Sequence, residues 1–278
     1  MRLIAIGDNV VDIYKERNEM FPGGNALNVA VLAKHSGAKR TAFIGIIGND
    51  DVGDHIIDSL EKNEVEISRI RRACGESGKA YVDLNEDGDR IFVGSNKGGI
   101  QSLLKIRLTE EDYQLIKQYD VLHTSIYSSL ENELETLKKS IQLSFDFSNH
   151  FDQEILKQVC PHLTFAFLSG SHLTEIEIKE LFLEIHSLGT PFAVVTRGSR
   201  GVMMSYKGKI YEQGIVETKV IDTLGAGDSF IAGFLTRYLE NLNIQDALQF
   251  AAYRASLTCE VNGAFGFGKN LDSELLSK

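Results

Sequence analysis

The chain has little cysteine and little proline. Its 278 residues include three cysteines, which lie far apart and form no Cys-x-x-Cys pair: Cys74, Cys160 and Cys259. This pattern gives no support to a zinc site or a thioredoxin-type redox centre, and a sparse, odd count suits a reducing cytoplasm. The three prolines form no Pro-rich linker, so the sequence favours a single domain over residues 1–278.

Long apolar runs and an excess of basic residues are also missing. No run approaches the ~20 apolar residues that a membrane-spanning helix needs. The opening residues 1–8 are too short for a signal peptide and predict a first strand instead. The formal net charge is -10, which argues against nucleic acid and anionic membranes as partners. We therefore expect a soluble, cytoplasmic protein.

Short apolar runs alternate with helical patterns along most of the chain. This alternation predicts an α/β fold with a mostly parallel sheet covered by helices on both faces. The predicted strands are 3–7, 41–47, 120–124, 143–147, 165–168 and 192–196. The predicted helices are 25–36, 51–62, 110–118, 132–140 and 175–187.

Two paired runs depart from the alternation. Residues 80–84 and 90–94 alternate polar and apolar side chains around the turn-rich link 85–89, which is the pattern of a hairpin. From the pattern alone, an edge hairpin without a special role and a lid over a site are equally supported. The second pair, 202–206 and 209–213, predicts an antiparallel edge of the sheet.

Small residues precede a helical run in the late segment Asp222-Thr223-Leu224-Gly225-Ala226-Gly227-Asp228-Ser229. Gly225, Ala226 and Gly227 allow a tight turn that directs several N–H groups to one spot at a helix N-terminus, which favours an anion. Asp228 falls in the first helical turn, where the dipole favours an ionised carboxylate. Phosphoryl transfer to an alcohol needs both a base and such donors. The alternative is an ordinary Gly-rich helix cap.

Two earlier segments carry groups that suit sugar hydroxyls. Paired glycines, Gly23 and Gly24, permit close approach of a ligand to the backbone, and Asn28 offers a donor and acceptors for vicinal hydroxyls. Asp8 and Asp12 follow the first strand and could accept hydrogen bonds from a sugar. Turn formation and helix capping explain all of these residues as well.

The segment Thr196-Arg197-Gly198-Ser199-Arg200-Gly201 follows a predicted strand. A strand-end threonine, two glycines and two arginines suit the phosphate tail of a nucleotide. A hairpin-entry turn with solvated arginines is equally possible. The phosphate-binding Gly-x-x-x-x-Gly-Lys-[Ser/Thr] motif is absent, and no Gly-x-Gly-x-x-Gly follows the first strand.

Taken in order along the chain, these segments resemble the ribokinase-like (PfkB) family of carbohydrate kinases, and residues 222–235 fit its C-terminal signature at every position. The resemblance implies a ribokinase-like fold with a small β-sheet lid, built from about 10–22 and 78–96. It implies transfer of the ATP γ-phosphoryl group to a sugar or nucleoside hydroxyl, with Mg²⁺. It also implies a homodimer paired through the lid.

The resemblance assigns roles to individual residues. Asp228 is the implied base, and the amides of Gly225, Ala226 and Gly227 are the implied anion hole. The implied sugar-binding residues are Asp8, Asp12, Gly23, Gly24 and Asn28. The implied nucleotide-binding residues are Thr196, Gly198, Gly201, Asp222, Thr223 and Asn262, with the adenine pocket near 252–263.

Within the family, residues 6–14, 21–26 and 145–148 resemble the branch that phosphorylates O6 of fructoselysine, a fructose joined to an amine. The alternatives are another sugar kinase of the family, such as a fructokinase or ribokinase, and a non-catalytic sugar-binding regulator.

One departure concerns the metal. Ser169-Gly170-Ser171-His172 stands where many relatives carry Asn-x-x-Glu, which is linked to Mg²⁺. Asp146 and Glu175 are alternative holders of metal-bound waters. We expect no tight all-protein metal site, because Mg²⁺ would arrive with ATP and keep several waters.

Overall fold

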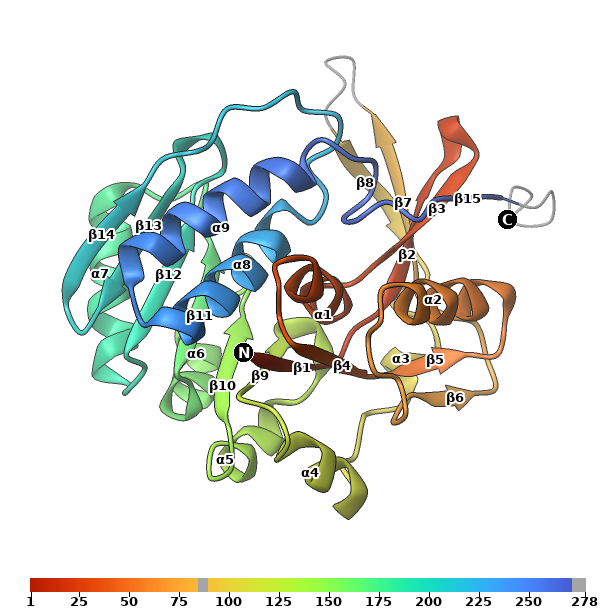
Figure 1. Ribbon diagram of the computed structural model, residues 1–278, viewed down its shortest axis with the longest axis horizontal. Coiled ribbons are helices and arrows are strands. Elements are labelled where there is room, and N and C mark those ends of the chain that lie inside the picture. Colours follow the sequence, from red (N-terminus) through yellow and green to blue (C-terminus); the bar gives the residue numbers. More distant parts are fainter. Residues whose placement is uncertain (85–89, 272–278) are drawn as a thin grey trace.

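An eight-stranded sheet forms the centre of the computed structural model, which describes residues 1–84 and 90–271 (Figure 1). Six neighbouring strands are parallel, and the last two continue the sheet antiparallel at one edge. In order across the sheet the strands are β4 (Arg40–Ile44), β1 (Arg2–Ile6), β9 (Val121–Ser125), β10 (Gln142–Asp146), β11 (Phe165–Ser169), β12 (Phe192–Thr196), β13 (Val202–Tyr206) and β14 (Lys209–Gln213). The predicted parallel sheet with an antiparallel edge is confirmed.

Helices cover both faces of this sheet because successive strand residues point to opposite sides. In β1, Leu3 and Ala5 belong to one core cluster and Ile4 and Ile6 to the other, and all four are fully buried. The first face packs against α1 (Asn25–His35), α8 (Ala226–Asn241) and α9 (Ile244–Thr258). The second face packs against α4 (Glu110–Ile116), α5 (Leu134–Leu137), α6 (Gln153–Val159) and α7 (Glu175–Ser187). Among the described residues, no helix is long and apolar enough to cross a membrane.

A second sheet of five strands stands beside α1 and α2 (Asp51–Lys62) (Figure 1). Its order is β15 (Lys269–Asn270), β3 (Glu19–Gly23), β2 (Val10–Tyr14), β7 (Lys79–Leu84) and β8 (Arg90–Ser95). The antiparallel pair of β7 and β8 confirms the predicted hairpin. The link expected at 85–89 lies outside the described residues.

Two predicted elements are divided in the structure. The strand expected at 41–47 ends with β4, and Ile46–Gly48 forms β5, which pairs with β6 (Arg71–Ala73) in a separate two-stranded sheet. The division follows from the partners of the backbone, because the carbonyl of Gly45 accepts from the amide of Arg71 at 2.9 Å.

The helix expected at 132–140 is a 3-10 turn, Glu131–Glu133, followed by α5. It ends early because the amides of Lys139 and Ser140 donate to carbonyls three residues back, which tightens the chain into a 3-10 turn.

Candidate active site

Two cavities, each of about 640 Å³, flank the residues that lead into α8. Leu224 and Asp228 line the first, which we call the carboxylate cavity because Asp8, Asp12 and Asp228 all line it. The second is the apolar cavity. Its lining includes Ile215, Val216, Val220, Phe230 and Ala252, together with Thr223, Ala226 and Gly227. The start of α8 therefore reaches both cavities.

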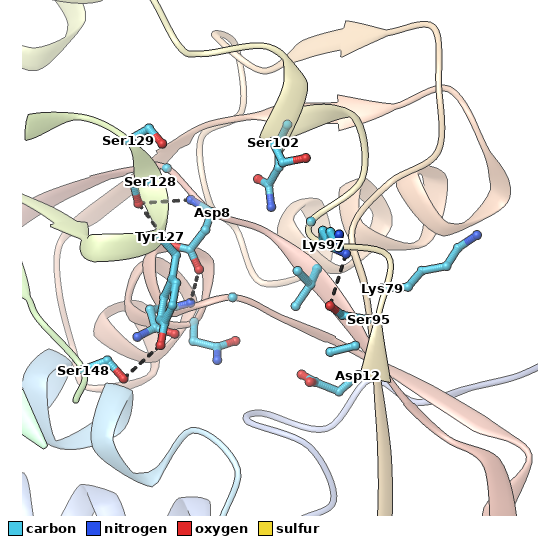
Figure 2. A pocket seen from close by; sticks show the side chains of 18 of the residues that line it. Asp8, Asp12, Lys79, Ser95, Lys97, Ser102, Tyr127, Ser128, Ser129 and Ser148 are labelled. Carbon is cyan, nitrogen blue, oxygen red and sulfur yellow. Dashed lines mark hydrogen bonds between the residues drawn. The ribbon is translucent and has the colours of Figure 1, made fainter. Parts of the chain in front are cut away.

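The carboxylate cavity gathers side chains from segments that are far apart in the chain (Figure 2). Asp8 follows β1, Asp12 lies on β2, Asn28 lies on α1, and Tyr127 belongs to the 3-10 turn Ile126–Ser128 after β9. Loops at the carboxyl ends of parallel strands share one edge of the sheet, which is where ligands bind in open α/β sheets.

Asp8 is held mainly as a cap of α1. Its carboxylate accepts hydrogen bonds from the amides of Asn25 at 2.6 Å and Ala26 at 3.3 Å. It also accepts from the hydroxyls of Ser125 at 2.6 Å and Ser128 at 3.0 Å. Helix capping, one of the two interpretations open from the sequence, thus accounts for much of its bonding capacity, although Asp8 still lines the cavity.

The paired glycines make room for the residues around them. A Cβ at Gly23 would lie 2.1 Å from Oδ2 of Asp12, so only glycine leaves this carboxylate its place. Gly24 has a φ of +106°, and a Cβ there would lie 2.7 Å from Cα of Asn9. Gly24 and Asp12 line the carboxylate cavity, whereas Gly23 lies against Asp12 outside that lining.

Asn28 and Asp228 meet because α1 packs against α8. Nδ2 of Asn28 donates to Oδ2 of Asp228 at 2.8 Å. Oδ1 of Asn28 is buried and has no hydrogen-bond partner among the described residues. A buried acceptor of this kind normally has a partner, so this oxygen is available to a ligand hydroxyl.

Asp228 does not have the low pKa that the helix dipole alone predicts. Burial and the negative charge of Asp146 raise its pKa well above the ordinary value, and the charges of Asp8 and Asp12 act in the same direction. The hydrogen bond from Asn28 acts in the opposite direction and is outweighed. The dipole argument from the sequence left out these larger effects, because burial and the neighbouring carboxylates arise only when the chain folds.

Asp146 lies at the end of β10 and is almost fully buried. Its carboxylate accepts hydrogen bonds from Nδ2 of Asn25 at 2.6 Å and from the amide of Ser148 at 2.8 Å. Burial nevertheless raises the pKa of Asp146 to about 6, and the charge of Asp8 contributes to the rise.

The start of α8 leaves backbone donors outside the helical ladder. The first bond across the helix start runs from the amide of Ser229 to the carbonyl of Gly225 at 2.8 Å. The amides of Gly227 and Asp228 therefore precede the intrahelical bonds. The amide of Ala226 is directed at the carbonyl of Thr223 at 3.3 Å, so it is less free than expected.

The two glycines of this turn serve different purposes. Gly225 has a φ of +74°, and a Cβ there would lie 2.4 Å from Cβ of Ala264, so packing requires glycine. A Cβ at Gly227 would meet nothing within 4 Å. Because Gly227 lines the apolar cavity, its lack of a side chain leaves space in that cavity.

Most residues expected at the nucleotide line the apolar cavity. They are Thr196, Gly198, Gly201 and Thr223, joined by Ala252, Ala255, Ser256 and Cys259 from the region expected for adenine.

Arg197 and Arg200 do not lie where they could contact the phosphates of a nucleotide in the apolar cavity. Arg197 is buried and faces Glu212 at 3.4 Å and Glu175 at 3.7 Å. Arg200 donates to the carbonyls of Ser171 and Leu173. Neither guanidinium reaches the apolar cavity, because the protein's own acceptors hold both.

Asp222 and Asn262 lie outside both cavities. Asp222 is buried and accepts hydrogen bonds from the hydroxyl of Tyr14 at 2.5 Å and from the amides of Leu224 and Gly263, both at 3.0 Å. Arg17 donates to Oδ1 of Asn262 at 2.6 Å. Asp222 therefore joins β2 to the loop before α8, whereas Asn262 joins the 3-10 turn Lys15–Arg17 to the segment after α9.

Several lining residues of the carboxylate cavity were not singled out from the sequence. Those missed include Lys79, Lys97, Gln101, Tyr127 and Ser128. A signal existed for Tyr127 and Ser128, which follow the carboxyl end of β9.

The part of the chain that the structure describes contains no group of three or more His, Cys, Asp or Glu side chains that could hold a metal ion. The two acidic residues considered for metal-bound waters have protein partners: Glu175 pairs with Arg197, and Asp146 accepts from Asn25.

Comparisons with known proteins agree with this geometry. The family model described as "pfkB family carbohydrate kinase" matches residues 1–266. The chain is 51% identical to "Fructosamine kinase FrlD" of Bacillus subtilis (strain 168), over 96% of this chain and 94% of that protein. It is 35% identical to "Fructoselysine 6-kinase" of Escherichia coli (strain K12), over 95% of this chain and 99% of that protein.

A solved structure shares the fold. The ribokinase of Arabidopsis thaliana complexed with ribose and ATP superposes with a TM-score of 0.82 at 21% sequence identity, covering 99% of this chain and 97% of that one.

Proposed function

Because the chain belongs to the pfkB family of carbohydrate kinases, we propose that it transfers the γ-phosphoryl group of ATP to the 6-hydroxyl of a fructosamine such as fructoselysine. The observation that carries the proposal is the start of α8, which lies between the carboxylate cavity and the apolar cavity. Carboxylates suit sugar hydroxyls and an amine, and an apolar cavity suits a nucleobase. The names of the two relatives support a fructosamine as the sugar.

The sugar occupies the carboxylate cavity with O6 beside Asp228. Asp228 accepts the hydroxyl proton while the O6–phosphorus bond forms and the bond from the γ-phosphorus to the bridging oxygen of ADP breaks. The amides of Gly225 and Gly227 stabilise the negative charge that develops during transfer, and the amide of Ala226 joins them when it gives up its 3.3 Å bond to the carbonyl of Thr223. A raised pKa suits this role, because a general base works best when its pKa lies near the operating pH.

The remaining contacts follow the lining of the two cavities. Asp12, Gly24 and Asn28 bind sugar hydroxyls, and Asp8 holds α1 in place for them. Thr196, Gly198, Gly201 and Thr223 surround the nucleotide. Mg²⁺ would arrive with ATP, where it would offset phosphate charge and keep several waters.

The five-stranded sheet serves as the lid of a single-domain enzyme, with residues 10–22 and 78–96 as its main parts. Pairing of two lids makes a homodimer, which sedimentation of the purified protein would test. The cytoplasmic location and the absence of nucleic-acid partners stay predictions from the sequence.

A substrate screen tests the proposed function. ADP release is measured with fructoselysine, fructose, ribose and a nucleoside at equal concentration. We expect the highest kcat/KM for fructoselysine. Faster turnover of free fructose or ribose would make the chain a fructokinase or ribokinase, and no turnover of any sugar would favour a non-catalytic regulator.

A further inference from the structure

We infer that the ammonium group of Lys97 binds the carboxylate of the amino acid part of the substrate, so that the enzyme selects fructosamines of amino acids over fructosamines of simple amines. This inference rests on the proposed function, and it concerns a residue that the sequence analysis did not single out.

The carboxylate cavity contains two lysines, and they differ in their surroundings. Nζ of Lys79 lies 3.5 Å from Oε2 of Glu76, and the Lys79 side chain is only 5% exposed. Its charge also lowers the pKa of Asp50, at the start of α2. Lys79 is therefore directed to the protein's own carboxylates.

Lys97 lines the same cavity but has no ion pair within 4 Å among residues 1–84 and 90–271. In the view of Figure 2, Lys97 and Ser95 lie across the cavity from Asp8 and Tyr127. The cavity thus has carboxylates in one part and an uncompensated cation in another.

A hydrogen-bonded turn holds the backbone of Lys97. Lys97 has a φ of +57°, and its amide donates to Oγ of Ser95 at 3.1 Å. Asn96 fixes the turn from the other side, because its side chain accepts from the amide of Lys79 and donates to the carbonyl of Ser77, each at 2.8 Å. Glycine adopts a left-handed backbone more readily than lysine, so the backbone conformation does not explain why lysine is present.

The charges match a fructosamine of an amino acid. Such a molecule carries sugar hydroxyls, an amine at the linkage and a carboxylate. The hydroxyls and amine are complementary to Asp12 and Asp228, whereas the substrate's carboxylate would be repelled by them. Lys97 supplies the opposite charge that this carboxylate needs, and a hydrogen bond to a charged group is among the stronger single contacts.

The test compares two substrates that differ only in the carboxylate. These are fructoselysine and its decarboxylated analogue, fructosyl-cadaverine, joined through the same amine. For Lys97→Met we expect kcat/KM to fall about tenfold or more with fructoselysine, mainly through KM. With fructosyl-cadaverine we expect a change of less than about threefold. Lys97→Arg should keep most of the preference for the carboxylate. Calorimetric titration without ATP should show the same difference in affinity.

Lys207→Met is the matched control. Lys207, like Lys97, is exposed and has a left-handed backbone, with a φ of 49°, but it lies in the hairpin between β13 and β14, lines neither cavity and stacks over Tyr206. The Lys207→Met variant should have unchanged kinetics with both substrates. An equal loss with both substrates in Lys97→Met, or no loss with either, overturns the inference about Lys97. Wild-type enzyme that turns over neither fructosamine but accepts fructose overturns the proposed function itself.

Discussion

Asp228 combines two properties that the tertiary structure brings together. Its carboxylate is held by Asn28 at 2.8 Å, so its orientation is set before any substrate binds. The carboxylates of Asp146, Asp8 and Asp12 raise its pKa together with burial. An oriented base of raised pKa can accept a hydroxyl proton more readily than an exposed aspartate can.

Replacement of Asp228 by asparagine tests the base. Asp228→Asn keeps the shape and an acceptor for Asn28 but cannot accept the proton. We expect kcat to fall by about 10²–10⁴, measured as ADP release with fructoselysine. Asp58→Asn, on the exposed side of α2, is the control and should retain full activity. An Asp228→Asn variant that keeps most of its activity would remove Asp228 from the role of base.

Removing the negative charge of Asp146 should change the pH dependence of activity. As the proposed base, Asp228 has to be ionised to accept a proton, so activity should be lost as the pH falls through its raised pKa. Asp146→Asn removes a negative charge that raises this pKa, and the acidic limb of kcat/KM should therefore move to lower pH. The measurement is the pH profile of kcat/KM for the wild type and for Asp146→Asn. An acidic limb that stays in place, or moves to higher pH, would show that the charge of Asp146 does not raise the pKa of Asp228.

At the scale of the element, two glycines in the first turn of α8 should respond differently to substitution by alanine. Gly225→Ala places a Cβ against Ala264 at a φ of +74°, so we expect a loss of about 1–3 kcal/mol in the free energy of unfolding. Gly227→Ala meets no atom of the protein, and alanine in a helix is favoured by roughly 0.5–1 kcal/mol. This variant should therefore be at least as stable as the wild type.

Gly227→Ala should nevertheless lose activity. The added methyl group enters the apolar cavity where the phosphates are proposed to lie. We expect kcat/KM for ATP to fall about tenfold or more, with urea denaturation and kinetics measured on the same preparation. Unchanged kinetics would show that phosphate does not approach this amide.

At the scale of the whole molecule, the five-stranded sheet is attached to the loop before α8. Tyr14 on β2 donates to Asp222, which also accepts from the amides of Leu224 and Gly263. The sheet that borders the carboxylate cavity and the turn that carries Asp228 are therefore held in one arrangement.

Tyr14→Phe removes one bond of this attachment. We expect a decrease of about 0.5–1.5 kcal/mol in the free energy of unfolding, measured by urea denaturation. Tyr253→Phe, with a side chain that is 48% exposed on α9, should change it by much less. Equal effects of the two substitutions would mean that the bond to Asp222 contributes no net stability.

The secondary structure could largely be predicted from the sequence because its signals are local. The helices expected at 51–62 and 175–187 and the strand at 192–196 have the observed bounds. Asp50 caps α2, and Thr174 with Glu177 forms the capping box of α7, and such caps act within a single turn. The division of 41–47 could not be predicted, because it depends on Arg71, a residue distant in the chain.

The sequence by itself determined the alternation of strands and helices, the small-residue turn before α8 and the family, since these depend on residues adjacent in the chain. Only the tertiary structure decided what the polar groups do. It turned Asp8 into a cap of α1, directed Arg197 and Arg200 to protein acceptors, and joined Asn28 to Asp228. Hydrogen bonds and pKa values depend on which distant groups come within a few ångströms, and in this protein those groups meet only after the helices have packed on the sheet.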